Sequence, residues 1–171
     1  MDVHKRFMRL ALAEAETALD EGEFPVGCVF VSDNRVIAQS RRKNSGGDHA
    51  NEIDHAEVLA LRQLLYSSPQ TDSSRITVYS TMEPCLMCYS TMLLSGIRRF
   101  VWAYEDVMGG GTNLRLKELN ELYAGMTVEI VPHILRSASL ALFQTFFHRY
   151  AYWQNSRLAE YTLAQSPGDR S

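Results

Sequence analysis

The chain is poor in cysteine and contains no long apolar run. Of its 171 residues only three are cysteines, Cys28, Cys85 and Cys88. So low and odd a number argues against a fold held together by disulfides, and Cys28 is expected to be a small buried side chain. No hydrophobic stretch approaches the roughly 20 residues needed to span a bilayer, and the first residues do not resemble a secretory signal. We therefore expect no membrane contact and a cytoplasmic location.

Basic charge is also scarce. The chain has 17 Lys and Arg against 20 Asp and Glu, a formal net charge of −3, which argues against an extensive electrostatic contact with nucleic acid. Two local clusters remain, at residues 41–43 and 98–99, and each predicts either a basic patch or a solvated group of charges. Length and composition predict a single domain over residues 1–165, with a disordered tail at 166–171.

Helical and strand patterns alternate along the chain. Apolar spacing predicts helices at 4–20, from about 55 to 66, from 84 to 94, at 114–122 and at 136–163. Runs rich in β-formers predict strands at 26–31, 36–38, 76–80, 99–103 and 127–131, of which the first two form a hairpin. We expect Asp54 to cap the second helix, Pro84 to occupy the first position of the third, and residues 108–111 to form a flexible loop. The order predicts an α/β fold, a three-layer α/β/α sandwich around a five-stranded mixed sheet.

Two short motifs carry chemistry. One is His55-Ala56-Glu57 and the other is Pro84-Cys85-Leu86-Met87-Cys88, each at a predicted helix start. Cysteines three apart lie on one helix face, and the first turn favours thiolate over thiol. Two thiolates and one imidazole suit Zn²⁺, and three protein ligands leave a fourth position open, as in catalytic sites. Zinc lowers the pKa of its bound water to about 7, and Glu57 is near enough to move that water's protons.

Each motif alone has simpler interpretations. A lone Cys-x-x-Cys also serves structural zinc or thiol exchange, and a lone His-x-Glu carries almost no information. Their occurrence together, each at a helix start, is far more specific. A closed structural zinc site would need a fourth ligand, for which Cys28 and His49 are the only obvious candidates, and neither pairs with another ligand. The combination therefore favours a catalytic metal site.

The two motifs resemble the signature of the cytidine deaminase-like superfamily. Residues 24–31, 34–37 and 81–88 are similar to the bacterial branch of tRNA-specific adenosine deaminases, and the resemblance extends over about residues 4–150. It implies a cytidine deaminase-like fold with one Zn²⁺ per chain on His55, Cys85 and Cys88, and Glu57 as the proton shuttle. It also implies that Asn44 and the backbone N–H of Ala56 contact the base, and that the enzyme is a homodimer.

The chain departs from this branch where substrate scope is set. The usual Asp-Pro-Thr before the histidine is replaced by residues 51–54, Asn-Glu-Ile-Asp, and the loop after the fourth strand lacks its lysine. Three functions stay open. The first is deamination of the wobble adenosine of tRNA to inosine with release of ammonia, and the second is deamination of a free base or nucleoside such as cytosine or guanine. The third is a non-catalytic subunit, against which the intact set of four site residues argues.

Overall fold

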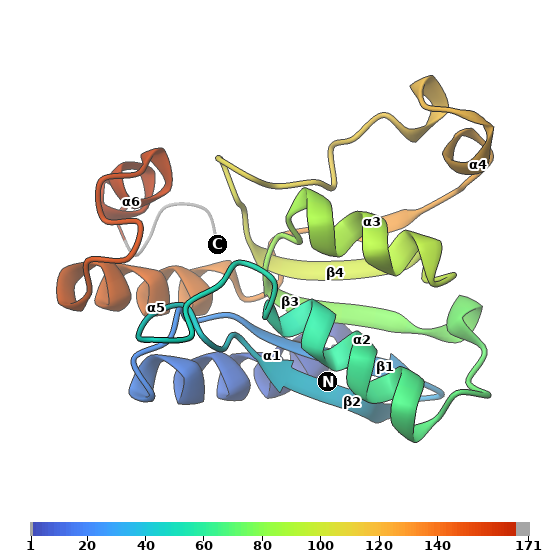
Figure 1. Cartoon of the computed structure of the whole chain (residues 1–171), viewed down its shortest axis with the longest axis horizontal. Helices are drawn as coiled ribbons and strands as arrows, with labels where there is room; N and C mark the ends of the chain where they lie inside the picture. Colours follow the sequence, from blue (N-terminus) through green and yellow to red (C-terminus); the bar gives the residue numbers. More distant parts are fainter. Residues whose placement is uncertain (1, 167–171) are drawn as a thin grey trace.

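The computed structural model describes residues 2–166 and has a five-stranded mixed sheet at its centre (Figure 1). The strand order is β2-β1-β3-β4-β5, in which β1 pairs antiparallel with β2 and β3, and β3, β4 and β5 run parallel. The strands are β1 (Gly27–Ser32), β2 (Arg35–Arg41), β3 (Thr77–Met82), β4 (Arg99–Tyr104) and β5 (Glu129–Val131). The helices are α1 (Val3–Asp20), α2 (Ala56–Ser67), α3 (Leu86–Leu94), α4 (Glu121–Ala124), α5 (Arg136–Arg149) and α6 (Arg157–Leu163).

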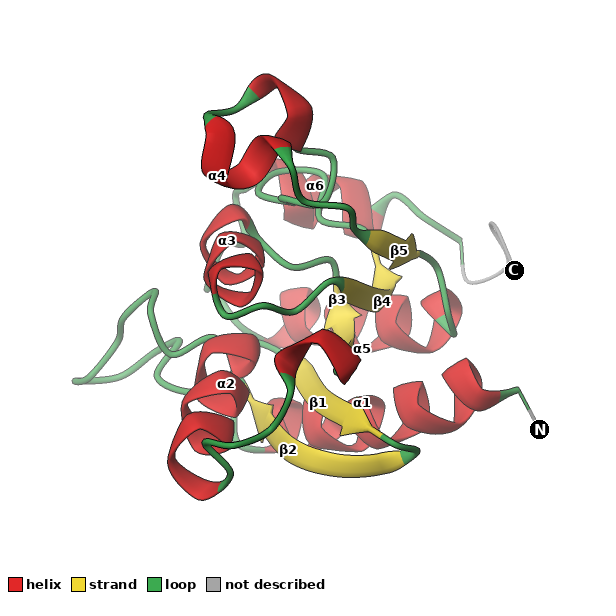
Figure 2. Cartoon of the chain, turned by 90° about the vertical axis from the view of Figure 1, so that its right-hand side faces the viewer, coloured by secondary structure: helices red, strands yellow, loops and turns green. Residues whose placement is uncertain are grey.

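Helices cover both faces of the sheet, so the predicted three-layer sandwich is confirmed. Figure 2 shows α2 and α3 on one face and α1 and α5 on the other. The side chains of β1 alternate between two cores: Cys28 and Phe30 pack in the larger one, and Val29 packs with α1 in the smaller one. At Gly27 a Cβ would lie 2.1 Å from the carbonyl oxygen of Ala11, so only glycine lets α1 approach β1 this closely.

Most predicted elements are confirmed within a few residues, but two caps are wrong. His55, not Asp54, is the N-cap of α2, and Cys85 is the N-cap of α3, which leaves Pro84 one residue before the cap instead of at the first helical position. The Asp54 carboxylate is not available for capping because it accepts hydrogen bonds from the side-chain amides of Asn44 and Asn51, at 2.7 and 2.8 Å.

Three other expectations are corrected. The helix predicted at 114–122 is reduced to a 3-10 turn, Leu116–Glu118, and the four residues of α4. The helix predicted at 136–163 is interrupted between α5 and α6, at residues 150–156. The glycines at 109–111 do not form a free loop: they pack on the turn that begins α3, where Gly111 N–H donates to the Pro84 carbonyl at 2.9 Å. A Cβ at Gly111 would lie 2.8 Å from the Cα of Leu86, so this packing requires glycine.

Within residues 2–166 no helix has both the length and the apolar character to cross a membrane. The predicted tail at 166–171 lies outside the described residues except for Ser166. The fold places the ends of β3 and β4 side by side, next to the point where the sheet changes from antiparallel to parallel pairing. In open α/β sheets this edge is where ligands bind.

Candidate metal centre and pocket

The starts of α2 and α3 bring one histidine and two cysteines together. His55 is the N-cap of α2, Cys85 is the N-cap of α3, and Cys88 lies in the first turn of α3. Their ligand atoms all lie within 4.8 Å of one another, and His55 Nδ1 is 3.5 Å from each sulfur. Because the positive ends of both helix dipoles point toward the cluster, this position stabilises thiolates.

The two thiols of the cluster differ in acidity. A hydrogen bond with Cys88 lowers the pKa of Cys85 to about 4, an effect that burial opposes and that His55 reinforces. The same hydrogen bond, together with burial, raises the pKa of Cys88. The cluster thus favours one thiolate, and the second cysteine would complete the donor set when a cation displaces its proton.

These three residues fit a zinc ion. A tetrahedral zinc with its usual bond lengths holds an imidazole nitrogen and a thiolate sulfur about 3.6 Å apart, close to both distances from His55. Among residues 2–166 no fourth histidine, cysteine or carboxylate joins the group. Cys28 is buried on β1, and neither it nor His49 is in the cluster, so a closed four-ligand site is not formed.

Glu57 lies beside the metal cluster and is only 3 % exposed. One carboxylate oxygen accepts from the Ser80 hydroxyl at 3.1 Å, and the other lies 3.5 Å from the Cys88 sulfur. Burial raises the pKa of Glu57 above its usual value. A carboxyl group whose pKa is raised toward neutrality can both accept and return a proton, as a general acid–base requires.

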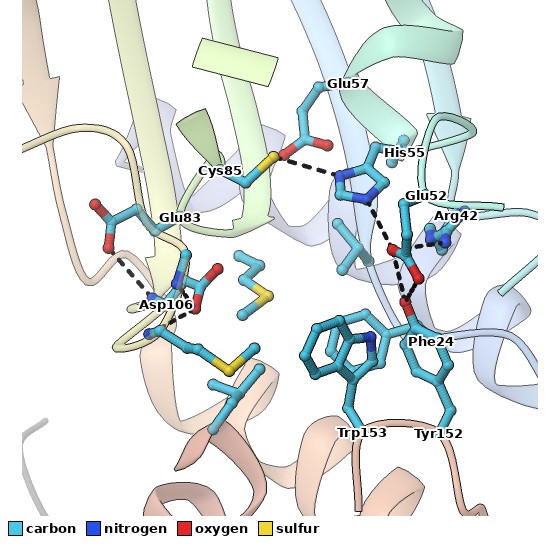
Figure 3. Close-up of a pocket in the computed structure, with 16 residues that line it drawn as sticks. Phe24, Arg42, Glu52, His55, Glu57, Glu83, Cys85, Asp106, Tyr152 and Trp153 are labelled. Atoms are coloured by element: carbon cyan, nitrogen blue, oxygen red, sulfur yellow. Dashed lines mark hydrogen bonds and ion pairs between the residues drawn. The ribbon is translucent and has the colours of Figure 1, made fainter. Parts of the chain in front are cut away.

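A cavity of about 200 Å³ opens beside the cluster (Figure 3). His55, Ala56, Glu57 and Cys85 form part of its wall, and apolar side chains form much of the rest. The other lining residues are Phe24, Val26, Arg42, Glu52, Met82, Glu83, Asp106, Met108, Gly109, Tyr152, Trp153 and Leu158. A largely apolar cavity with a few polar groups and a candidate metal site is a small-ring binding pocket.

The residues predicted as site residues do not all reach this cavity. His55, Glu57, Cys85 and Cys88 come together, and Ala56 lines the wall. Asn44 is not among the lining residues. Its backbone has a φ of 55°, its N–H donates to Glu23 at 3.0 Å, and its side-chain amide donates to Asp54 at 2.7 Å.

Arg42 organises the loop before His55, a role that the sequence did not reveal. The Arg42 side chain is 2 % exposed, so the basic cluster at residues 41–43 is neither a fully solvated group of charges nor a free basic patch. Its guanidinium donates to the carbonyls of Asn51 at 2.6 Å and Asp54 at 3.1 Å, and to that of Lys43. The planar fork of an arginine can satisfy several carbonyls at once, so this residue fixes the path of residues 43–54.

The loop after β4 is fixed by two carboxylates. Glu83 accepts from the N–H groups of Asp106 and Thr112, at 3.2 and 3.3 Å, and Asp106 accepts from that of Gly109 at 2.8 Å. Burial raises the pKa of Asp106, although its backbone hydrogen bonds oppose this. Glu105 faces away from this network and pairs with Arg136 at the start of α5, Nε to Oε2 2.8 Å.

The remaining wall comes from residues 150–156, between α5 and α6. Figure 3 shows Tyr152 and Trp153 beside Phe24, below His55. The rings of Phe24 and Tyr152 are 5.4 Å apart, and Phe24 also contacts Phe143 and Phe146 of α5 at 5.1 and 5.2 Å. The sequence pattern predicts a helix through this segment, and its aromatic content is the one local signal for a place in the pocket.

Comparisons with known proteins agree with this geometry. Residues 1–104 match the cytidine and deoxycytidylate deaminase zinc-binding region. A tRNA-specific adenosine deaminase of Agrobacterium fabrum is 30% identical over 145 residues, covering 82% of this chain and 91% of the relative. One from Bacillus subtilis is 29% identical over 141 residues, covering 82% and 86%.

Solved structures share the fold. A structure from a study of A-to-I editing by tRNA:A34 deaminases at the wobble position has a TM-score of 0.66 and 28% identity, and the match covers 80% of this chain and 98% of that one. A guanine deaminase from Nitrosomonas europaea has a TM-score of 0.64, with 81% of both chains covered. At 18% identity this second likeness shows the fold alone.

Fold and site together define a hydrolytic deaminase that acts on nucleobases. The chain belongs to the cytidine and deoxycytidylate deaminase zinc-binding family, and its similarity to tRNA-specific adenosine deaminases continues well beyond the zinc-binding region. The predicted family, fold and class of reaction are thereby confirmed.

Proposed function

We propose that this protein is a zinc-dependent deaminase that converts the wobble adenosine of tRNA to inosine with release of ammonia. The observation that carries the proposal is the convergence of His55, Cys85 and Cys88 beside the buried carboxylate of Glu57, at the wall of a cavity that suits one ring. The similarity to tRNA-specific adenosine deaminases over 82% of the chain supports the choice of substrate.

His55, Cys85 and Cys88 would hold one zinc ion per chain. The bound zinc supplies a Lewis acid that makes water a nucleophile near neutral pH. Glu57 would take one proton from the attacking water and deliver it to the ring nitrogen next to the attacked carbon, while the water oxygen forms its bond to that carbon. The same carboxylate would then carry the remaining proton of that oxygen to the exocyclic amine, so that the carbon–nitrogen bond breaks, ammonia leaves and the oxygen stays on the ring as a carbonyl. The buried position of Glu57 keeps bulk water from competing for these protons.

Ala56 and Asn44 would hold the base in place. Ala56 lines the cavity next to His55, and its backbone N–H would donate to a ring atom at that wall. The Asn44 amide now donates to Asp54, and its oxygen or its second N–H would serve a base that enters from the side of this loop. Asn44→Ala is expected to raise KM more than it lowers kcat.

The direct test is inosine formation. Zinc-loaded protein is incubated with unmodified tRNA carrying a wobble adenosine, and the digested RNA is analysed by mass spectrometry. Inosine at that one position is expected, and the same tRNA with guanosine at the wobble position should give none. No inosine from protein holding one zinc per chain would refute the tRNA proposal.

A free base or nucleoside is the second candidate, and the charge of the cavity favours it. Glu52, Glu83 and Asp106 line the wall, and the guanidinium of Arg42, which also lines it, is engaged with backbone carbonyls. Carboxylates near the opening repel a phosphate backbone. Ammonia release from adenosine, guanine or cytosine, measured with the same zinc-loaded protein, tests this alternative.

We also propose a homodimer and a cytoplasmic location, where a tRNA substrate would be met. On α3, Met92 and Leu93 are buried, whereas Leu94 is 58% exposed. Leu86, on the same helix, is 54% exposed. An apolar surface of this kind suits a contact between copies. Sedimentation of the protein and of a Leu86→Glu/Leu94→Glu variant tests this, with a monomeric wild-type protein as the contradicting result.

A further inference from the structure

Glu52 connects three groups at the opening of the pocket. Its two carboxylate oxygens each lie 2.9 Å from the Tyr152 hydroxyl, and one of them is 3.4 Å from Arg42 Nη2 and 3.7 Å from His55 Nε2 (Figure 3). The Glu52 side chain nevertheless remains 58% exposed. A hydrogen bond to an ionised acceptor is about twice as strong as a neutral one. Glu52 thus ties the loop that precedes the zinc ligand to a segment 100 residues further along the chain.

Trp153 follows Tyr152 directly and has an unusual backbone. Its φ is 54°, in the left-handed region that bulky residues rarely adopt, so its contacts must hold it there. The indole lies edge-on to the Tyr152 ring, with centroids 5.9 Å apart, and lines the cavity although it is 43% exposed. Tyr152 in turn packs edge-on to Phe146 of α5 at 6.2 Å.

We propose that Glu52 and Tyr152 form a latch that holds Trp153 as one wall of the pocket, and that the substrate ring stacks on this indole. Trp153 is then a substrate-binding residue, and Glu52 and Tyr152 are positioning residues. The proposal rests on the function proposed above in one respect, that the ligand is a flat heteroaromatic base. Stacking accepts any such ring, so the wall selects for an extruded base and leaves the choice among bases to the polar groups.

The latch is tested without any substrate, by acrylamide quenching of tryptophan fluorescence in the zinc-loaded full chain. The chain has two tryptophans, and a Trp153→Phe variant gives the contribution of Trp102, which is 7% exposed. Tyr152→Phe removes only the hydroxyl and should make Trp153 more quenchable and shift its emission to the red. Glu52→Ala should do the same, and the double variant should add nothing further, because the two groups act as one unit.

The matched control is Tyr66→Phe, the same change on α2 at a residue that is 88% exposed, and it should leave the quenching unchanged. Tyr152→Phe removes no contact of His55, so this variant should retain one zinc per chain. It therefore still tests the latch if Glu52→Ala loses its zinc. Quenching that stays at the wild-type value in Tyr152→Phe would overturn the latch.

The stacking role is tested by kinetics on tRNA with a wobble adenosine. Trp153→Ala should raise KM by about tenfold or more, the usual effect of removing a stacked aromatic from one base, while Trp153→Phe should restore most of the loss because it keeps a flat ring. An unchanged KM in Trp153→Ala would overturn the stacking wall. If wild-type protein forms no inosine, the same comparison is made by ammonia release from adenosine, guanine and cytosine. The quenching result decides the latch in either case.

Discussion

The candidate metal ligands come from two short turns, whereas the walls around them come from three segments that are far apart in the chain. The ligand turns lie at residues 55–57 and 84–88, where residue type and local spacing define the chemistry. The surrounding walls come from residues 43–54, 105–112 and 150–156, which meet only in the folded chain. Chemistry that depends on a few adjacent residues is visible in a sequence, whereas the shape of a pocket depends on long-range contacts that local patterns do not contain.

The largest effect is expected at the ligand turns, from the proton carrier. Glu57→Gln should keep one zinc per chain and lower kcat by about 10²- to 10⁴-fold, because the amide cannot carry a proton. Zinc content and single-turnover kinetics on tRNA with a wobble adenosine check this. Glu118→Gln, a change of the same kind at a side chain that is 65% exposed, is the control. Near-normal turnover in Glu57→Gln would show that another group moves the protons.

Loss of a ligand should affect the metal and the fold together. Cys88→Ala removes one of three donors and should abolish stoichiometric zinc binding, because metal affinity depends on every ligand. The melting temperature should fall by about 5 °C or more, since each kcal/mol lost lowers it by about 2–4 °C in a chain of this size. Cys28→Ala is the matched control, because this buried cysteine lies outside the ligand cluster. A full zinc equivalent in Cys88→Ala would refute its assignment.

Sequence periodicity predicted the sheet and most of the long helices because each has one buried face. It failed where a local preference was overruled by a distant partner. Asp54 is a good capping residue, but Asn44 and Asn51 occupy its carboxylate. The same limit applies to the pocket: the Tyr152–Glu52 hydrogen bond joins residues 100 positions apart, and no local pattern contains it.

A third prediction concerns the wall at residues 43–54. Arg42→Ala should destabilise the protein by on the order of 3 kcal/mol, since it leaves buried carbonyls without a donor, and it should raise KM because the loop loses its fixed path. Arg42→Lys should recover little, because an ammonium cannot reproduce the planar fork. Arg41→Lys is the control at the neighbouring, 26% exposed side chain. Denaturant unfolding measures the stability, and a wild-type value for Arg42→Ala would show that the loop is held by other contacts.

The smallest effect tests whether all of the segment after β4 belongs to the pocket. Burial raises the pKa of Glu105, but hydrogen bonds from Arg136 and Tyr161 lower it more strongly. The pKa is therefore about 2 instead of the ordinary 4.5. A depressed pKa in the folded state means that this carboxylate stabilises the protein above about pH 4.5, and that its contribution is lost as the pH falls toward 2.

The variant Glu105→Gln should therefore be less stable than wild type at neutral pH and should lose less stability between pH 4.5 and pH 2, while KM stays unchanged. Unfolding in urea across this pH range measures the difference, and Glu118→Gln, at an exposed pair, should follow the wild-type curve. A raised KM in Glu105→Gln would instead assign Glu105 to the substrate. An unchanged KM would show that Glu105 serves only to hold the start of α5, and that the pocket wall begins at Asp106.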